Sequence, residues 1–190
     1  MSDETNGRIE LLSLEASREA AEAVGVSPML QEKIIFRLLL RRPQLAKAVN
    51  DLLFSLLFEG VLSDRLRELV IMRIGWATGS DYEWSQHWTV AQAAFGCSPE
   101  DLLAVRDWRS AERFGEPERA VLAATDETLA TGTISAETWA LCEQHLGGPD
   151  ECLELIAAIG TWRMISQLAR SSEIPNDPEL DSWPPDGVAP

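Results

Sequence analysis

The sequence predicts an all-α protein, and three observations lead to this prediction. Apolar residues recur at the three- and four-residue spacing of helices, glycines and prolines stand where helices would end or begin, and no segment shows the alternating pattern of a β-strand between tight turns. The chain has 190 residues, of which 45% are apolar and 25% are charged. This length and composition are typical of one folded domain, in which we expect about six to eight helices.

Each predicted helix has a recognisable beginning or end. Serine is favoured at the position that caps a helix N-terminus, proline is favoured in the first turn, and glycine is favoured just past the last turn. In chain order, these signals predict helical segments at residues 14–24, 29–40, 43–59, 64–78, 80–95, from 99 onward, 117–131, 135–146 and 149–170.

The two ends of the chain differ from the helical domain that we expect over residues 13–170. Residues 1–12 are expected to form a flexible N-terminal segment, since the start of the chain is polar. Residues 171–190 contain five prolines among acidic residues, which predicts an extended tail instead of a helix. Apolar residues within this tail, such as Trp183, indicate that it lies on the surface of the body or on that of a neighbouring subunit.

The charge of the chain excludes several classes of partner. The net charge of −15 and the pI near 4.5 disfavour binding to nucleic acid or to an anionic membrane. No apolar run approaches the roughly 20 residues that span a bilayer, and the first residues lack the pattern of a secretory signal. The three cysteines are widely spaced, so neither a disulfide framework nor a zinc knuckle is expected. We therefore expect a cytoplasmic protein.

Ionisable residues on two consecutive predicted helices form the candidate site. In the segment after Gly79, Glu83 and His87 share a stripe with apolar Val90 and Ala94, so the stripe should face the core. Ionisable groups are rarely buried without a partner, because an unpaired buried charge costs several kcal/mol.

The preceding helix carries an acidic residue in a similarly apolar setting. Glu68 lies among residues that are apolar almost all round, and Gly75 leaves space on the same face. The turn at Gly79 should fold the two helices into an antiparallel hairpin, which would bring Glu68 toward Ser80, Glu83 and His87. A cluster of two carboxylates and an imidazole against apolar walls is a candidate active site.

At these residues the sequence resembles a known family. Glu68, followed after eleven residues by Ser80-Asp81-Tyr82-Glu83 and then His87, resembles the core motif of the carboxymuconolactone decarboxylase and alkylhydroperoxidase-D-like family. The likeness extends over most of the chain. It implies a single-domain helical bundle that assembles as a homotrimer or homohexamer, with the site near a subunit boundary. Weaker similarities flank the motif at Arg41-Arg42-Pro43-Gln44-Leu45, Phe58-Glu59-Gly60 and Ile174-Pro175.

The chain departs from the peroxidase branch of that family at two positions. In that branch the second helix begins with Cys-x-x-Cys, whereas this chain has Ser80 and Glu83 there. Because neither residue can form a disulfide, a thiol peroxidase is disfavoured. Glu68 and His87 are retained, which is similar to the decarboxylase branch, and that branch works without metal, flavin or thiol. The resemblance therefore implies a carboxy-lyase that requires no cofactor.

Decarboxylation needs a proton delivered to carbon, and three residues are candidates for that chemistry. His87 is the expected general acid–base, since the ordinary histidine pKa lies near 6.5. Glu68 would orient the imidazole or stabilise its charged form. Glu83 would relay a proton if burial raises its pKa.

A small carboxylated substrate would need side chains that line its pocket and a positively charged side chain that binds its carboxylate. We expect Ser80, Tyr82 and Trp84 to contact it. Arginine supplies 14 of the 16 basic residues, and a guanidinium can hold a carboxylate through two parallel hydrogen bonds. The candidates on the first helix of the motif are Arg73, Arg65 and Arg67.

Simpler roles exist for the same residues. Ser80 and Glu83 have the spacing of a capping box, and Glu68 could pair with Arg65 one turn earlier. Glu83 and His87 could ligate a metal, but the chain has only one other histidine, so no metal is expected.

Other functions also stay open at this point. The same cluster could serve dehydration, isomerisation or retro-aldol cleavage of a carbonyl compound. The chain could also be an antioxidant member of the family, which the missing cysteine pair disfavours, or a non-catalytic ligand-binding or scaffold member.

Overall fold

The computed structural model describes residues 7–190, and all of its regular elements are helical, as predicted. Residues 1–6 of the expected flexible segment lie outside the described residues. The described part has nine α-helices, one in each of the nine predicted segments and one more than the six to eight expected for the domain as a whole. The elements are α1 (Leu14–Val24), α2 (Ile34–Leu39), α3 (Pro43–Phe58), α4 (Asp64–Thr78), α5 (Asp81–Ala94), α6 (Pro99–Ala104), the 3₁₀ turn η1 (Val105–Asp107), α7 (Glu116–Thr131), α8 (Ala136–His145) and α9 (Pro149–Ser172).

Most helix boundaries follow the local signals in the sequence. The hydroxyls of Ser13, Ser98 and Ser135 each accept a hydrogen bond from the backbone amide three residues later, which caps α1, α6 and α8. Gly79 ends α4 with φ of 67°, a left-handed conformation that glycine adopts without strain. The chain then reverses directly into α5, so the predicted hairpin is confirmed.

The segment predicted as a helix at 29–40 is helical only from Ile34 to Leu39. Its first half forms turns, because side chains of remote segments bind its backbone. The amide of Ile34 donates to Oδ1 of Asp177 at 2.8 Å, and just before the segment the amide of Ser27 donates to Oδ1 of Asn50 at 2.9 Å. The contact with Asp177 satisfies a backbone amide that a helix starting at residue 29 would satisfy internally.

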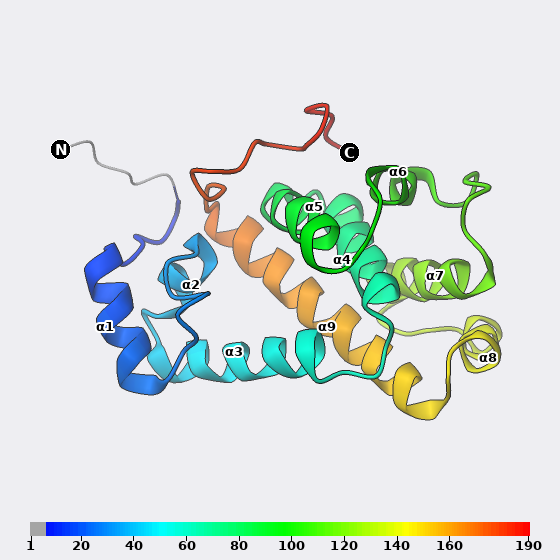
Figure 1. Ribbon diagram of the computed structural model, residues 1–190, viewed down its shortest axis with the longest axis horizontal. Helices are drawn as coiled ribbons and strands as arrows, with labels where there is room; N and C mark the ends of the chain where they lie inside the picture. The colour runs from blue at the N-terminus through cyan, green and yellow to red at the C-terminus, as the bar shows by residue number, and fades with distance from the viewer. Residues whose placement is uncertain (1–6) are drawn as a thin grey trace.

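Helix α4 lies at the centre of the molecule and contacts α5, α6, η1, α7 and α9 (Figure 1). Residues 66–72 of α4 are all buried. This explains why its sequence is apolar almost all round, since a helix covered on every side has no face for water.

Gly75 allows α4 and α5 to approach closely. A Cβ atom at this position would lie 3.1 Å from the backbone nitrogen of Trp84 and 3.5 Å from Cβ of Glu83. The space that the sequence left at Gly75 is thus filled by the backbone of α5. The close approach brings the side chains of α4 within reach of those of α5.

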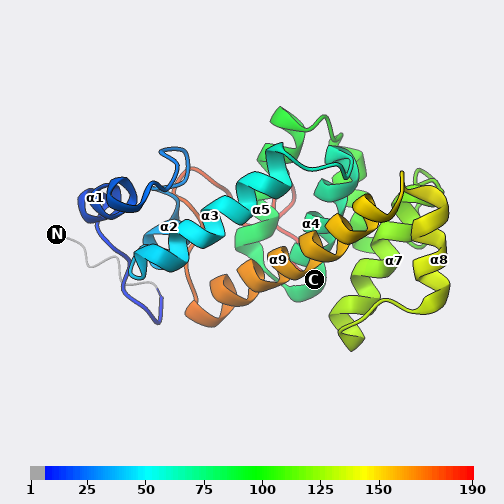
Figure 2. The ribbon, with the colours of Figure 1, turned by 90° about the horizontal axis from the view of Figure 1, so that it is seen from below.

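Two hydrophobic cores share the long helix α9. The larger core packs α4, α7 and parts of α5 and α9, and the smaller one packs α1, α2, α3 and the last turns of α9. Figure 2 shows α1 and α2 at one end of the molecule and α7 and α8 at the other, with α9 running between them. Within residues 7–190, no helix has both the length and the apolar character needed to cross a bilayer.

The C-terminal tail packs on the body of its own chain. Helix α9 continues to Ser172, two residues past its predicted end. The indole of Trp183 then packs against those of Trp76 and Trp84, with ring centroids 5.9 and 6.1 Å apart. The indole N–H of Trp84 donates to the carbonyl of Pro184 at 2.7 Å. Apolar packing and hydrogen bonding therefore both fix the tail.

Candidate active site

Glu68 and His87 meet between α4 and α5. Oε2 of Glu68 lies 2.8 Å from Nδ1 of His87, and the carboxylate is fully buried. Arg67 is also buried, and its Nε lies 3.4 Å from Oε1 of Glu68. The Glu68 carboxylate therefore has a guanidinium on one side and an imidazole on the other, which compensates its charge away from water. The expected alternative of a pair between Glu68 and Arg65 is wrong, because Arg65 binds Asp101.

A residue from α9 completes the environment of the histidine. Nε1 of Trp162 lies 3.1 Å from Nε2 of His87. An indole N–H can only donate, so Nε2 must accept, and the single proton of the neutral ring resides on Nδ1. Nδ1–H then donates to Glu68. Both ring nitrogens of His87 are thus engaged, and the tautomer follows from the geometry.

Opposing effects act on the pKa of His87. Burial lowers it, whereas the charge of Glu68 and the hydrogen bond to Glu68 together raise it by more, so that the net shift is upward. The N–H of Trp162 acts in the opposite direction, because it can bind only the form in which Nε2 carries no proton.

Glu83 is buried beside this pair without a hydrogen-bond partner. Its Oε2 lies 3.9 Å from Nε2 of His87 and is out of contact with water. Burial, reinforced by the nearby charge of Glu68, raises the pKa of Glu83 to about 7, although His87 acts to lower it. Near neutral pH a large fraction of the molecules consequently carry Glu83 in its protonated form.

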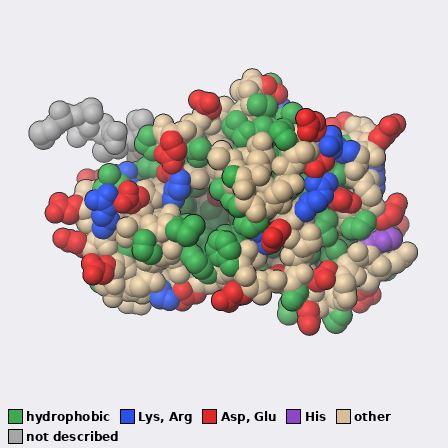
Figure 3. Space-filling model, viewed as in Figure 1, with side chains coloured by type: hydrophobic (Ala, Val, Ile, Leu, Met, Phe, Trp, Pro, Cys, Tyr) green, Lys and Arg blue, Asp and Glu red, His purple; other side chains and the backbone are tan. Residues whose placement is uncertain are grey.

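A cavity of about 400 Å³ opens in front of Glu83 and His87. It lies between α2, α3, α5 and α9, where Figure 3 shows a hollow edged by hydrophobic side chains. Its size is in the range of small-molecule sites. The apolar lining includes Ile35, Phe36, Leu53, Leu57, Trp162 and Ile165.

Most polar side chains that line the cavity already have partners. The hydroxyl of Tyr82 accepts a hydrogen bond from the amide of Ile35 at 3.2 Å, and the amide of Gln86 donates to Asp177. Thr89 is exposed at the rim. Glu83 is therefore the buried polar group that can still bind a ligand within the cavity.

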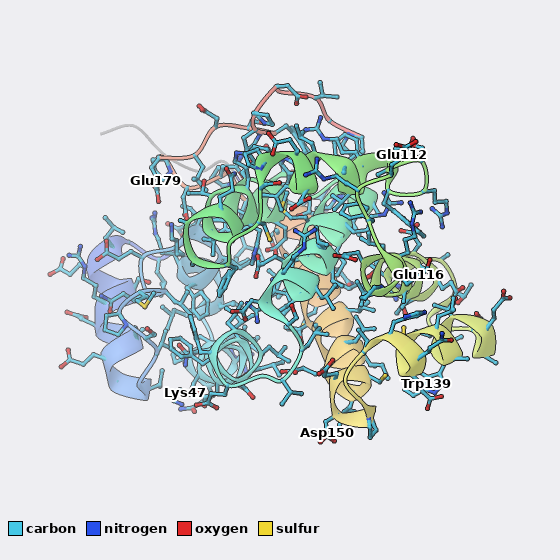
Figure 4. The ribbon with its side chains drawn as sticks, turned by 45° about the vertical axis from the view of Figure 1, so that its right-hand side comes forward. Lys47, Glu112, Glu116, Trp139, Asp150 and Glu179 are labelled. Carbon is cyan, nitrogen blue, oxygen red and sulfur yellow. The ribbon has the colours of Figure 1, made fainter. Side chains whose placement is uncertain are left out.

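One cation lies at the wall of the cavity. Nζ of Lys33 is 2.9 Å from Oδ2 of Asp177 and 2.9 Å from Oε1 of Glu179. Figure 4 shows Glu179 on the C-terminal segment, above α1 and α2. Burial lowers the pKa of Lys33, and the two carboxylates raise it by more. Lys33 therefore stays charged at neutral pH.

Three residues predicted to contact substrate lie away from the cavity. Trp84 points to the opposite side of α5, into the cluster with Trp76 and Trp183. Arg73 binds both carboxylate oxygens of Asp126, at 2.6 and 3.1 Å. Ser80 is buried at the beginning of α5, lines a separate small pocket, and has a hydroxyl without a partner.

The simpler roles considered for the site are also not found. Neither Ser80 nor Glu83 forms the hydrogen bonds of a capping box at the start of α5. Among the residues that the structure describes, no group of three His, Cys, Asp or Glu side chains is arranged to hold a metal.

No cysteine lines the described cavity. Cys97, Cys142 and Cys152 are buried elsewhere, and burial raises the pKa of the Cys97 and Cys142 thiols to about 11. A thiol with such a pKa is a poor nucleophile at neutral pH.

Residues 43–127, which include the whole of α3, α4 and α5, match the model of the carboxymuconolactone decarboxylase family. The match covers both helices of the site and supports the resemblance seen in the motif. No curated protein matches the chain in sequence.

Solved structures share the fold over nearly the whole chain. An uncharacterized peroxidase-related protein from Silicibacter sp. TM1040 has a TM-score of 0.74 at 15% identity, covering 94% of this chain and 96% of that one. A protein with an alkylhydroperoxidase AhpD core from Ralstonia eutropha JMP134 has a TM-score of 0.72 at 17% identity, covering 97% and 98%. The debrominase Bmp8 has a TM-score of 0.68 at 15% identity, covering 93% and 94%.

Trp162 and Lys33 are the site residues that sequence analysis missed. Trp162 lies 75 positions after His87, and its apolar neighbours on α9 indicate only that it packs in the core. Lys33 lies in the segment predicted as a helix. Its position at the cavity depends on Asp177 of the tail, so no local pattern could reveal it.

Proposed function

We propose that the protein is a cofactor-free carboxy-lyase in which Glu83 is the general acid. The substrate would be a small carboxylic acid with an apolar body and a carbonyl group that can stabilise an enolate. The observation that carries this proposal is the buried carboxyl of Glu83, which has no hydrogen-bond partner and faces an apolar cavity beside the Glu68–His87 pair.

The reaction needs one proton, and Glu83 can supply it. In a β-keto acid, the carbon–carbon bond to the carboxylate breaks, carbon dioxide leaves, and the bonding electron pair forms an enolate. The proton of Glu83 is then transferred to this enolate, and solvent restores the proton afterwards. A carboxyl with a pKa of about 7 is well matched to this task near neutral pH.

The apolar cavity favours this reaction over simple binding of the acid. A carboxylate loses hydration when it enters apolar surroundings, whereas carbon dioxide is uncharged, so the cavity disfavours the reactant more than the product. Lys33 takes the place of the arginine that we expected to hold the carboxylate. Its two acidic partners limit its attraction for an anion.

His87 and Glu68 act through Glu83 in this proposal. Because both nitrogens of His87 are engaged, the role of general acid passes from His87 to Glu83. The negative charge of Glu68 helps to keep the proton on Glu83 until substrate binds. After proton transfer, Nε2 of His87 lies 3.9 Å from the new carboxylate of Glu83, which solvent reprotonates.

The other activities named among the structural neighbours are less well supported. A thiol peroxidase needs a cysteine pair at the positions of Ser80 and Glu83, and the existing thiols do not line the cavity. The Bmp8 debrominase has been solved as a cysteine-to-alanine variant with 2,3,4-tribromopyrrole. A protein of similar fold thus binds a small ring compound, which is compatible with a ring-bearing substrate here, whereas no cysteine lines the cavity of this chain.

Carbon dioxide release tests the proposal. We expect the protein to release it from γ-carboxymuconolactone or from benzoylacetate, a β-keto acid with an apolar ring. Glu83→Gln should lower kcat/KM by about 100- to 10,000-fold, the usual contribution of a general acid. In the wild type, kcat/KM should fall as the pH rises through about 7, because the acid form of Glu83 is lost there.

Two matched controls accompany this test. Glu143→Gln changes an exposed acid on α8, and His145→Ala changes the other histidine, so both should retain full activity while His87→Ala loses it. The proposal would be contradicted if the wild type released carbon dioxide from γ-carboxymuconolactone and from benzoylacetate no faster than buffer alone. Equal rates for wild type and Glu83→Gln would also contradict it.

A further inference from the structure

Near neutral pH a proton can reside on Glu83 or on His87, whose Oε2 and Nε2 atoms lie 3.9 Å apart. With Glu83 protonated and His87 neutral, the pair carries no charge, and with Glu83 ionised and His87 protonated, it again carries none. Both arrangements leave the same charge beside Glu68 and Arg67. The choice between them therefore depends on where the proton lies relative to Glu68 and Arg67, and on the hydrogen bonds that each arrangement permits.

The contacts of Trp162 distinguish the two arrangements. Its indole N–H points to Nε2 of His87 at 3.1 Å, with the rings nearly perpendicular at 82°. A proton on Nε2 would place two N–H donors against each other. Trp162, a residue of α9, is only 2% exposed and packs in the larger hydrophobic core. Its side chain therefore cannot turn away without disturbing that core.

We propose that Trp162 is a positioning residue that keeps this proton on Glu83, ready for transfer into the cavity. The use of this proton in catalysis rests on the proposed function, whereas the protonation states of His87 and Glu83 can be tested without it. The indole N–H stabilises neutral His87, and Glu83, whose Oε2 has no other partner, retains the proton.

The groups around His87 act on its proton in both directions: burial and the charge of Arg67 favour the neutral ring, whereas Glu68 and Glu83 favour the protonated ring, which the N–H of Trp162 opposes. The lining residues of α3 and α9 are not ionisable. Tyr82 stays neutral, because burial raises its pKa well above 10. The ionisable groups that act on the pKa of His87 are Glu68 and Arg67 from α4 and Glu83 from α5, and the other ionisable residues that line the same cavity are Tyr82 from α5 and Lys33 from the segment before α2.

Nitrogen NMR of protein labelled with ¹⁵N-histidine tests the proposal without any substrate. The chain has two histidines, so His145→Gln assigns both sets of signals. At pH 7 wild-type His87 should show the neutral form with the proton on Nδ1. An imidazolium, or a neutral ring with its proton on Nε2, would overturn the proposal even if no variant folded.

Trp162→Phe is the matched variant, since it keeps the aromatic ring and removes the N–H. The proton affinity of His87 should rise about tenfold, which is one pH unit, because the lost hydrogen bond favoured only the neutral ring. The infrared band of the protonated Glu83 carboxyl, identified by its absence in Glu83→Gln, should weaken in Trp162→Phe. An unchanged His87 titration in folded Trp162→Phe would also overturn the proposal.

A distant tryptophan supplies the control for packing effects. Trp139 lies on α8, at the far end of the molecule from the site (Figure 4). Trp139→Phe should leave the titration of His87 unchanged. Because these measurements need no turnover, a protein that shows the expected tautomer but releases no carbon dioxide would refute the proposed function and leave the role of Trp162 standing.

Discussion

Glu83 is a single buried acid that would link stability to the proposed function. Its side chain is 3% exposed and has no hydrogen-bond partner on Oε2, so its ionised form is poorly stabilised in the folded protein. Such an arrangement lowers stability and persists where the group has a task. The cost of this arrangement depends on pH in a predictable direction.

The wild type should lose stability as the pH rises from about 4.5 to about 7. The pKa of Glu83 is higher in the folded than in the unfolded protein, so the folded state binds more protons in this range and its advantage falls as protons are lost. Glu83→Gln should remove this contribution, which amounts to roughly 3 kcal/mol above pH 7. Urea denaturation of both proteins at pH 5 and pH 8 measures it.

In that comparison, Glu143→Gln should follow the wild type, because Glu143 is exposed on α8. An equal difference between wild type and Glu83→Gln at both pH values would show that Glu83 is not a high-pKa acid in the folded state.

Among the helices and turns, the features that could be predicted are those determined by residues close together in the sequence. The helices around Gly79 follow from caps, a glycine turn and apolar periodicity, so their hairpin and the approach of Glu68 to His87 could be foreseen. The turns at 27–33 could not, because the amide of Ile34 is bound by Asp177, which is remote in sequence. The direction of Trp84 also escaped prediction, since α5 is apolar on two faces and Trp84 packs against Trp183 of the tail, which is remote in sequence.

The tail and the cavity wall should be coupled through Asp177. This carboxylate is 3% exposed and binds the amide of Ile34, Nζ of Lys33 and the side chain of Gln86. Asp177→Ala should lower stability by about 2–3 kcal/mol, because several buried donors lose a charged acceptor. Hydrogen exchange measured by mass spectrometry should become faster in residues 27–35.

Asp181→Ala is the control for this change, since Asp181 is an exposed acid of the same tail. It should leave both stability and exchange unaltered. If Asp177→Ala behaved in the same way, the tail would not hold the cavity wall.

At the scale of the whole molecule, large apolar side chains remain exposed near the cavity. Met29 and Phe58, which line its mouth, are 72% and 57% exposed, and nearby Val61 is 59% exposed. Contiguous exposed apolar surface often marks an interaction site. The family resemblance implies a trimer or hexamer, and this rim is the surface that we expect subunits to cover.

Sedimentation equilibrium should therefore give a mass of three or six times 21.0 kDa for the wild type. Phe58→Glu should reduce that mass, because a charge cannot be buried at an apolar contact without a partner. Leu153→Glu alters a residue of α9 that is 66% exposed outside the cavity lining and should have no effect. A monomeric wild type would contradict the expectation, and dissociation by Leu153→Glu alone would move the contact to α9.

The position of the cavity between two hydrophobic cores has a consequence for how this protein can change. The acid and its supporting pair stand on α4 and α5, whereas much of the facing wall comes from α2 and α3, which pack in the smaller core. Substitutions at Ile35 or Leu53 can reshape the space for a ligand while the proton-bearing groups keep their geometry. In the proposed reaction, chemistry and selectivity would thus be carried by separate parts of one chain, and each could vary while the other is preserved.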